Sequence, residues 1–93
     1  MPILSFLSLE VEAFFRTGTT RQWTNIAKVA ARKLDMLNAA VALNDLRLPP
    51  GNRLEALKDD RRGQHSIRIN DQFRLCFVWT DTGPTNVEIV DYH

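Results

Sequence analysis

The feature that most restricts the fold of this chain is the alternation of apolar residues in its last third. Over residues 66–69 and 73–79, an apolar side chain occupies every second position, as in strands that cover a core with one face. Asn70-Asp71-Gln72 separates these two segments, and Asp81-Thr82-Gly83-Pro84 separates the second from a third at residues 86–92. Strands joined by such short turns pair with their neighbours, so the pattern predicts a three-stranded antiparallel meander.

Two helical patterns precede the strands. The first helix is expected to begin after Ser8, which can cap it, and to end at Gly18. The second is expected from Trp23 or Thr24 to Val41. Its apolar side is formed by Ile26, Val29, Ala30, Leu34, Leu37 and Val41. With the short apolar segment 3–7 interpreted as a first strand, the expected fold is α+β: an N-terminal strand, two helices, then the meander, in one domain of residues 1–93.

The composition excludes several classes of protein. No apolar run approaches the ~20 residues that a membrane helix needs, and no Lys or Arg precedes the apolar N-terminus as in a secretory signal. The single Cys76 excludes an internal disulfide framework and an all-cysteine metal site. His65 and His93 are too few for a protein-only zinc site. We expect a cytoplasmic protein with no membrane contact.

Positive charge is concentrated in one stretch, although the net charge is only +1. Residues 47–74 hold seven of the twelve basic residues and four acidic ones, and no Lys or Arg follows Arg74. Such a concentration is typical of a surface that meets phosphates, although a solvated loop without a ligand has the same composition. The segment 54–63 is interpreted as a polar loop that Leu54 and Leu57 anchor to the core.

The chain has no phosphate-binding loop, dinucleotide-binding turn or paired cysteines, so acid–base and electrostatic chemistry remain. Metal-free RNA cleavage suits this set, because the 2′-hydroxyl of RNA can itself attack the adjacent phosphate. The protein then has to deprotonate that hydroxyl, protonate the leaving 5′-oxygen and stabilise the negative phosphorane. His or Glu suits the first task, His or Lys the second, and Arg and Lys the third.

Five segments that extend over nearly the whole chain carry a resemblance to a known family. They are residues 14–18, 48–58 (which include Gly51-Asn52-Arg53-Leu54-Glu55-Ala56-Leu57-Lys58), 63–70, 73–77 and 87–93 (which end in Asp91-Tyr92-His93). In these segments the chain resembles the RelE/ParE superfamily of bacterial toxins, most closely the HigB-type plasmid-maintenance killer toxins of type II toxin–antitoxin systems. The resemblance implies a ribosome-dependent mRNA interferase that cuts mRNA in the ribosomal A site without a metal or other cofactor, and a HigA-type helix-turn-helix antitoxin as partner.

The resemblance also implies site residues. Lys58 matches a loop lysine that steadies the phosphate, and Glu55 stands where members have His or Glu. With the terminal cluster, the catalytic candidates are Glu55, Lys58, Asp91, Tyr92 and His93. The candidates for binding RNA phosphates are Arg53, Arg61, Arg62, Arg68, Arg74 and His65.

Departures from the family pattern keep alternatives open. Residues 7–10 lack the basic side chains that members carry after the first strand, and His65 and Phe73 stand where aromatic residues, often Trp, occur. One alternative is a toxin of the ParE branch, which inhibits DNA gyrase, although Lys58 and His93 argue against it. Another is an inactive relative that binds its antitoxin or the ribosome without cutting RNA.

Overall fold

The structure, a computed structural model, describes residues 1–91. Within them lie two α-helices, α1 (Leu9–Thr17) and α2 (Ala27–Ala39). Four strands follow: β1 (Glu55–Ala56), β2 (His65–Arg68), β3 (Phe73–Thr80) and β4 (Gly83–Asp91). They form one antiparallel sheet in the order β1-β2-β3-β4. The predicted α+β class and the meander of the last three strands are confirmed. No helix in the described part of the chain is long and apolar enough to span a membrane.

Helix α1 has the ends that its sequence predicts. Ser8 precedes the helix in an extended conformation, and its hydroxyl accepts a hydrogen bond of 3.3 Å from the Val11 amide. Gly18 follows the helix with a φ of 77°, and its amide donates to the Phe14 carbonyl over 2.8 Å. Glycine takes this left-handed conformation without a steric penalty, so it stops the helix where the chain must turn away.

The second helix is shorter than the sequence suggested. A 3₁₀ turn, η1 (Thr24–Ile26), leads into α2, and Ala40 after the helix is extended with a ψ of 136°. Val41 is 68% exposed, so its expected place on the apolar side of the helix was wrong. The carboxylate of Asp45 explains the early end, because it accepts hydrogen bonds from the Val41 and Ala42 amides outside the helix.

The expected N-terminal strand is reduced to an isolated parallel bridge between Phe6 and Val87. Backbone hydrogen bonds still tie residues 4–7 to β4: Leu4 N to Pro84 O at 2.8 Å, and Leu7 N to Val87 O at 2.9 Å. The register between β3 and β4 shifts near this point, and Asn86 has a φ of 53°. A bulge of this kind bends the strand and interrupts its edge, which prevents a regular fifth strand.

The segment interpreted as a polar loop contains a strand instead. Glu55 pairs with Ser66, and Ala56 pairs with His65, so β1 adds a fourth strand at the edge next to β2. The Leu57 amide extends this pairing with a 2.9 Å hydrogen bond to Gln64 O. Leu57 is buried and Leu54 packs against the core, so the predicted anchoring is confirmed.

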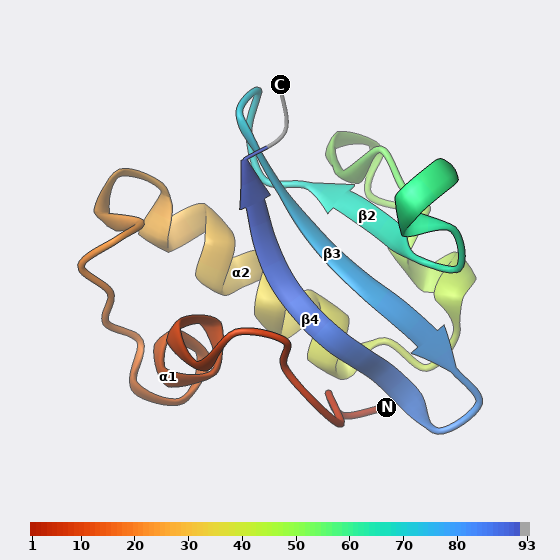
Figure 1. The fold of residues 1–93 in the computed structure, drawn as a ribbon, viewed down its shortest axis with the longest axis horizontal. Helices are drawn as coiled ribbons and strands as arrows, with labels where there is room; N and C mark the ends of the chain where they lie inside the picture. Colours follow the sequence, from red (N-terminus) through yellow and green to blue (C-terminus); the bar gives the residue numbers. More distant parts are fainter. Residues whose placement is uncertain (92–93) are drawn as a thin grey trace.

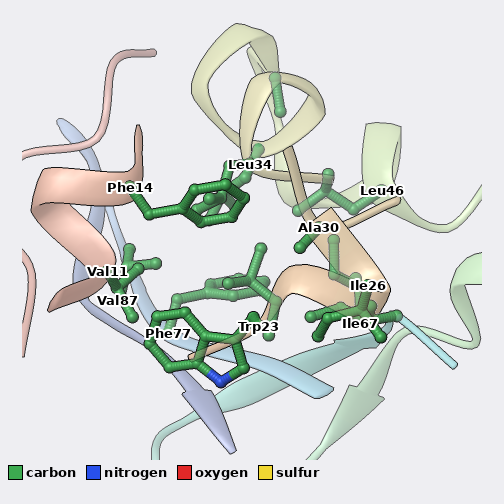
Figure 2. Close-up of a cluster of buried hydrophobic side chains, with 14 residues drawn as sticks. Val11, Phe14, Trp23, Ile26, Ala30, Leu34, Leu46, Ile67, Phe77 and Val87 are labelled. Carbon is green, nitrogen blue, oxygen red and sulfur yellow. The ribbon is translucent and has the colours of Figure 1, made fainter. Parts of the chain in front are cut away.

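One face of the sheet and the two helices enclose the core. Figure 2 shows Phe14 of α1, Leu34 of α2 and Phe77 of β3 within one cluster of buried side chains, and all three are at most 1% exposed. Figure 1 shows α1 beside β4 and α2 passing behind the strands, whereas the connection between β1 and β2 lies at the opposite edge of the sheet. We call the sheet face that meets the helices the inner face and the other the outer face.

Candidate functional site

The pairing of the strands places a row of polar residues on the outer face. Glu55 lies opposite Ser66, Ser66 opposite Cys76, and Cys76 opposite Glu88. Directly opposed residues in antiparallel strands share a face, and neighbours along a strand alternate between faces. Since Leu75 and Phe77 belong to the core, the row through Cys76 must lie on the outer face. Arg68 and Arg74 form the adjacent pair on that face.

Arg74 connects β1, β2 and β3 at the centre of this face. Its Nη1 lies 3.1 Å from Ser66 Oγ, 3.3 Å from Glu55 Oε1 and 3.4 Å from the Arg53 carbonyl. The side chain is only 16% exposed. The alternation in the sequence correctly places Arg74 on the face opposite the core, but its guanidinium is largely covered by protein groups instead of pointing into solvent.

Glu55 and Lys58 border a cavity beside this arginine. The cavity of about 340 Å³ is lined by Glu55, Ala56, Leu57, Lys58 and Asp59. Lys58 is exposed, and the Glu55 side chain is 49% exposed. A carboxylate and an ammonium that line one open cavity are both accessible to a ligand from solvent.

Arg61 lies over the same face but is paired within the protein. It belongs to the 3₁₀ turn η4 (Asp59–Arg61), and its Nη1 lies 3.1 Å from Glu88 Oε2 and 3.1 Å from Gln64 Oε1. A phosphate that bound Arg61 would compete with the Glu88 carboxylate. Arg62, the next residue, is exposed.

Cys76 lies fully buried in the outer row, close to the charges of Arg61, Glu88 and Arg74. Burial raises the pKa of its thiol to about 11, because the thiolate loses its hydration there. Cys76 is therefore an inert, buried thiol.

Arg68 and Arg53 stand at the margin of the outer face. Arg68 forms an ion pair with Asp71 in the turn after β2, and this hydrogen bond lowers the pKa of the Asp71 carboxyl. Arg53 is exposed and has a left-handed φ of 46° just before β1. Both arginines remain accessible at least in part, Arg68 with 30% of its side chain exposed.

His65 and Asp91 are not brought to this row. His65 lies opposite Phe77 in the register and stacks on its ring, with centroids 6.3 Å apart, so it belongs to the inner face. Burial, and secondarily the charge of Arg47, lowers the pKa of His65, and its buried Nδ1 has no partner among residues 1–91. Asp91 lies opposite Phe73 and accepts a 3.0 Å hydrogen bond from Gln72 Nε2.

The candidates Tyr92 and His93 lie outside the described residues. Among residues 1–91, no group of three or more His, Cys, Asp or Glu side chains is placed to hold a metal ion.

Three residues of the outer face were missed from the sequence: Ser66, Gln64 and Glu88. Ser66 had a usable signal, because the alternation around Ile67 places it on the same face as Arg68. Glu88 had none, since its partner Arg61 lies 27 residues earlier in the chain. Ion pairs between distant segments have no local sequence pattern.

The architecture resembles that of a solved structure, and the sequence identifies the family. A solved structure titled "YoeB/ParE toxin from Agrobacterium tumefaciens" superposes with a TM-score of 0.59 over all of both chains, at 17% sequence identity. That likeness concerns the fold alone. At the level of sequence, residues 4–93 match the family described as "RelE-like toxin of type II toxin-antitoxin system HigB". The chain belongs to this family, which confirms the resemblance found in its motifs.

Two relatives are similar over shorter stretches. The chain is 50% identical over 58 residues to "Toxin HigB-1" of Vibrio cholerae serotype O1, a match that covers 62% of this chain and 61% of that protein. It is 41% identical over 76 residues to an uncharacterized protein of Haemophilus influenzae, covering 80% of this chain and 75% of that one. The first match thus spans less than two thirds of the V. cholerae toxin.

Proposed function

We propose that this chain is the toxin of a type II toxin–antitoxin system and acts as a metal-independent endoribonuclease on ribosome-bound mRNA. The observation that carries the proposal is the meeting of Glu55 and Arg74 on the outer face, 3.3 Å apart, beside the cavity that Lys58 lines. A carboxylate that is paired with one cation and shares an open cavity with a second suits a phosphodiester with an internal nucleophile. Family membership supports the toxin class, and the geometry supports the chemistry.

The proposed reaction assigns a task to each of these groups. Glu55 accepts the proton of an RNA 2′-hydroxyl, whose oxygen then attacks the adjacent phosphorus. Arg74 and Lys58 stabilise the extra negative charge of the phosphorane. The bond to the 5′-oxygen breaks as that oxygen takes up a proton, which leaves a 2′,3′-cyclic phosphate and a free 5′-hydroxyl.

The general acid is proposed to be His93, with Asp91 and Tyr92 beside it as the sequence resemblance implies. Arg53, Arg62 and Arg68 extend the basic surface along which RNA would lie. Phosphate contacts of this kind fix a nucleic acid in position without reading its bases. The ribosomal A site would then select and present the mRNA.

The proposed partners are the ribosome, its mRNA and an antitoxin of the HigA type, in the cytoplasm. A type II toxin implies a protein antitoxin, and the match to the HigB family supports the proposal that this antitoxin is of the HigA type. Arg32 on α2 is exposed, and we expect Arg32→Glu to weaken antitoxin binding more than Lys58→Ala does.

Primer extension on mRNA in programmed ribosomes tests the proposal. We expect cuts within the A-site codon that need ribosomes and leave a 2′,3′-cyclic phosphate on the upstream fragment, as the proposed attack by the 2′-hydroxyl requires. Glu55→Gln and a chain lacking His93 should each abolish the cuts while still co-sedimenting with ribosomes. No cleavage by the unchanged chain would overturn the nuclease. Arrest of DNA synthesis before protein synthesis would point instead to gyrase.

A further inference from the structure

Asn52 is a fully buried polar residue immediately before the segment that carries Glu55 and Lys58. It ends the 3₁₀ turn η3 (Pro50–Asn52) and has no exposed surface. Its Nδ2 donates to the Leu46 carbonyl over 3.0 Å and lies 3.1 Å from Met36 Sδ. A buried amide is costly unless its polar atoms are paired, so these bonds hold Asn52 in one orientation.

The carbonyl end of the same amide is held by α2. Asn52 Oδ1 accepts a hydrogen bond from Lys33 Nζ, in the second turn of that helix. Burial, and then the charges of Arg32 and Arg68, lower the pKa of Lys33. A partly buried ammonium has to be hydrogen-bonded, and Asn52 Oδ1 accepts one of its hydrogens. One side chain thereby fastens the proline-rich connector to the core helix.

The chain that follows Asn52 is weakly held by its own pairing. β1 has only two residues, and a strand this short contributes little stability alone. Two residues with left-handed backbone angles bracket the segment, Arg53 with a φ of 46° and Asp59 with a φ of 54°. Such angles in non-glycine residues persist only where the surroundings impose them, and they gather at functional sites.

We infer that Asn52 is a positioning residue: it fixes the start of segment 53–58, so that Glu55 stays against Arg74 and Lys58 stays at the cavity. The Arg53 carbonyl, one residue after Asn52, is itself 3.4 Å from Arg74 Nη1. Asn52 therefore holds segment 53–58 from the core side, and Arg74 holds it from the outer face. The role of Asn52 in catalysis rests on the proposed function, whereas its role in ordering segment 53–58 does not.

Amide hydrogen exchange tests the structural part without any activity. In Asn52→Ala, the Leu57 amide, which is bonded to Gln64 O, should exchange about tenfold faster or more, because the substitution removes the side-chain bonds to Leu46, Met36 and Lys33 that anchor the segment. The amides between β3 and β4 should keep their protection. Val11→Ala is the control, since Val11 is fully buried in α1 at a distance in sequence from this segment. No change at Leu57, or the same increase throughout the sheet, would overturn the inference.

A second variant guards against a failure to fold. Lys33→Met removes one hydrogen bond of Asn52 and keeps its bonds to Leu46 and Met36, and Leu57 should again exchange selectively faster. On ribosomes, both variants should lose about tenfold in kcat with KM unchanged, whereas Val11→Ala keeps its kcat. An equal change in kcat for Val11→Ala would show a loss of stability only. If the unchanged chain does not cut mRNA, the proposed function fails, and the exchange result still decides the role of Asn52.

Discussion

The inner and outer faces of the sheet differ in what holds their side chains in place. On the inner face, Leu75 and Phe77 pack against α1 and α2 and have no exposed surface. On the outer face, the ion pair Arg74–Glu55 joins β3 to β1, and the ion pair Arg61–Glu88 joins the 3₁₀ turn η4 to β4. The apolar contacts supply most of the stability, whereas the ion pairs are directional and arrange charge. In this protein, most of the stability therefore comes from the inner face, and the candidate chemistry lies on the outer face.

Truncation of Phe77 should have the largest effect on folding. Phe77→Ala removes a fully buried ring from the inner face, so we expect the free energy of unfolding to fall by about 3–5 kcal/mol. Val78→Ala, one residue along the same strand on the outer face, should cost much less because Val78 is only half-buried. Urea denaturation followed by circular dichroism measures both. Equal losses in the free energy of unfolding would show that the inner face does not contribute more to stability than the outer face.

Substitutions on the outer face should lower the cleavage rate more than they lower the free energy of unfolding. Lys58→Ala should reduce the cleavage rate about 100-fold, as for other groups that stabilise a transition-state charge, with stability changed by no more than about 0.5 kcal/mol. Arg74→Ala should reduce the rate similarly and also lower stability by about 1–3 kcal/mol, because it leaves the buried Ser66 hydroxyl without this partner. Single-turnover cleavage and urea midpoints on the same samples separate the two effects. Full activity of Lys58→Ala would contradict the site.

The ion pair Arg61–Glu88 should contribute a smaller free energy to stability. Its side chains are 35% and 19% exposed, so solvent screens the charges in part, and we expect a coupling of about 1 kcal/mol or less. A double-mutant cycle with Arg61→Met and Glu88→Gln measures it, with the exposed pair Arg16–Glu12 on α1 as the control for a weak surface contact. A coupling equal to that of Arg16–Glu12 would mean that Arg61 is not held over the sheet by Glu88.

The smallest expected effect is the pH dependence of stability that arises from His65 on the inner face. Because burial lowers the pKa of His65, the unfolded chain binds a proton at a higher pH than the folded one. Stability is then complete above about pH 6.5, the ordinary value for histidine, and declines as the pH falls below it. The slope of the urea midpoint between pH 7.5 and 5.5 should shrink in His65→Gln. An unchanged slope in His65→Gln would show that His65 does not cause this pH dependence.

The sequence was a good guide to the inner face because alternation and helix capping are local. Phe73, Leu75 and Phe77, like the ends of α1 at Ser8 and Gly18, lie where their patterns predict. The two-residue β1 is too short to show alternation, and its pairing with β2 depends on the turn between them. The reduced N-terminal strand follows from the bulge in β4 at Asn86.

The candidate site was predicted in part. Glu55, Lys58 and Arg74 were found through the resemblance and do lie near one another on the outer face. Arg61 was predicted to bind phosphate, but the sequence carried no sign that Glu88 would neutralise it. Whether a basic residue faces solvent or a carboxylate depends on contacts between distant segments, which periodicity does not encode.

Cys76 gives the outer face a native reporter. Its sulfur is the only thiol in the chain, it is fully buried, and its high pKa suppresses the reactive thiolate. A chromogenic disulfide reagent can therefore react with it only when the structure around the thiol opens. The rate of colour development measures how often this opening occurs in the unlabelled wild-type protein, and a drop in this rate on adding RNA or antitoxin would reveal which of them suppresses it.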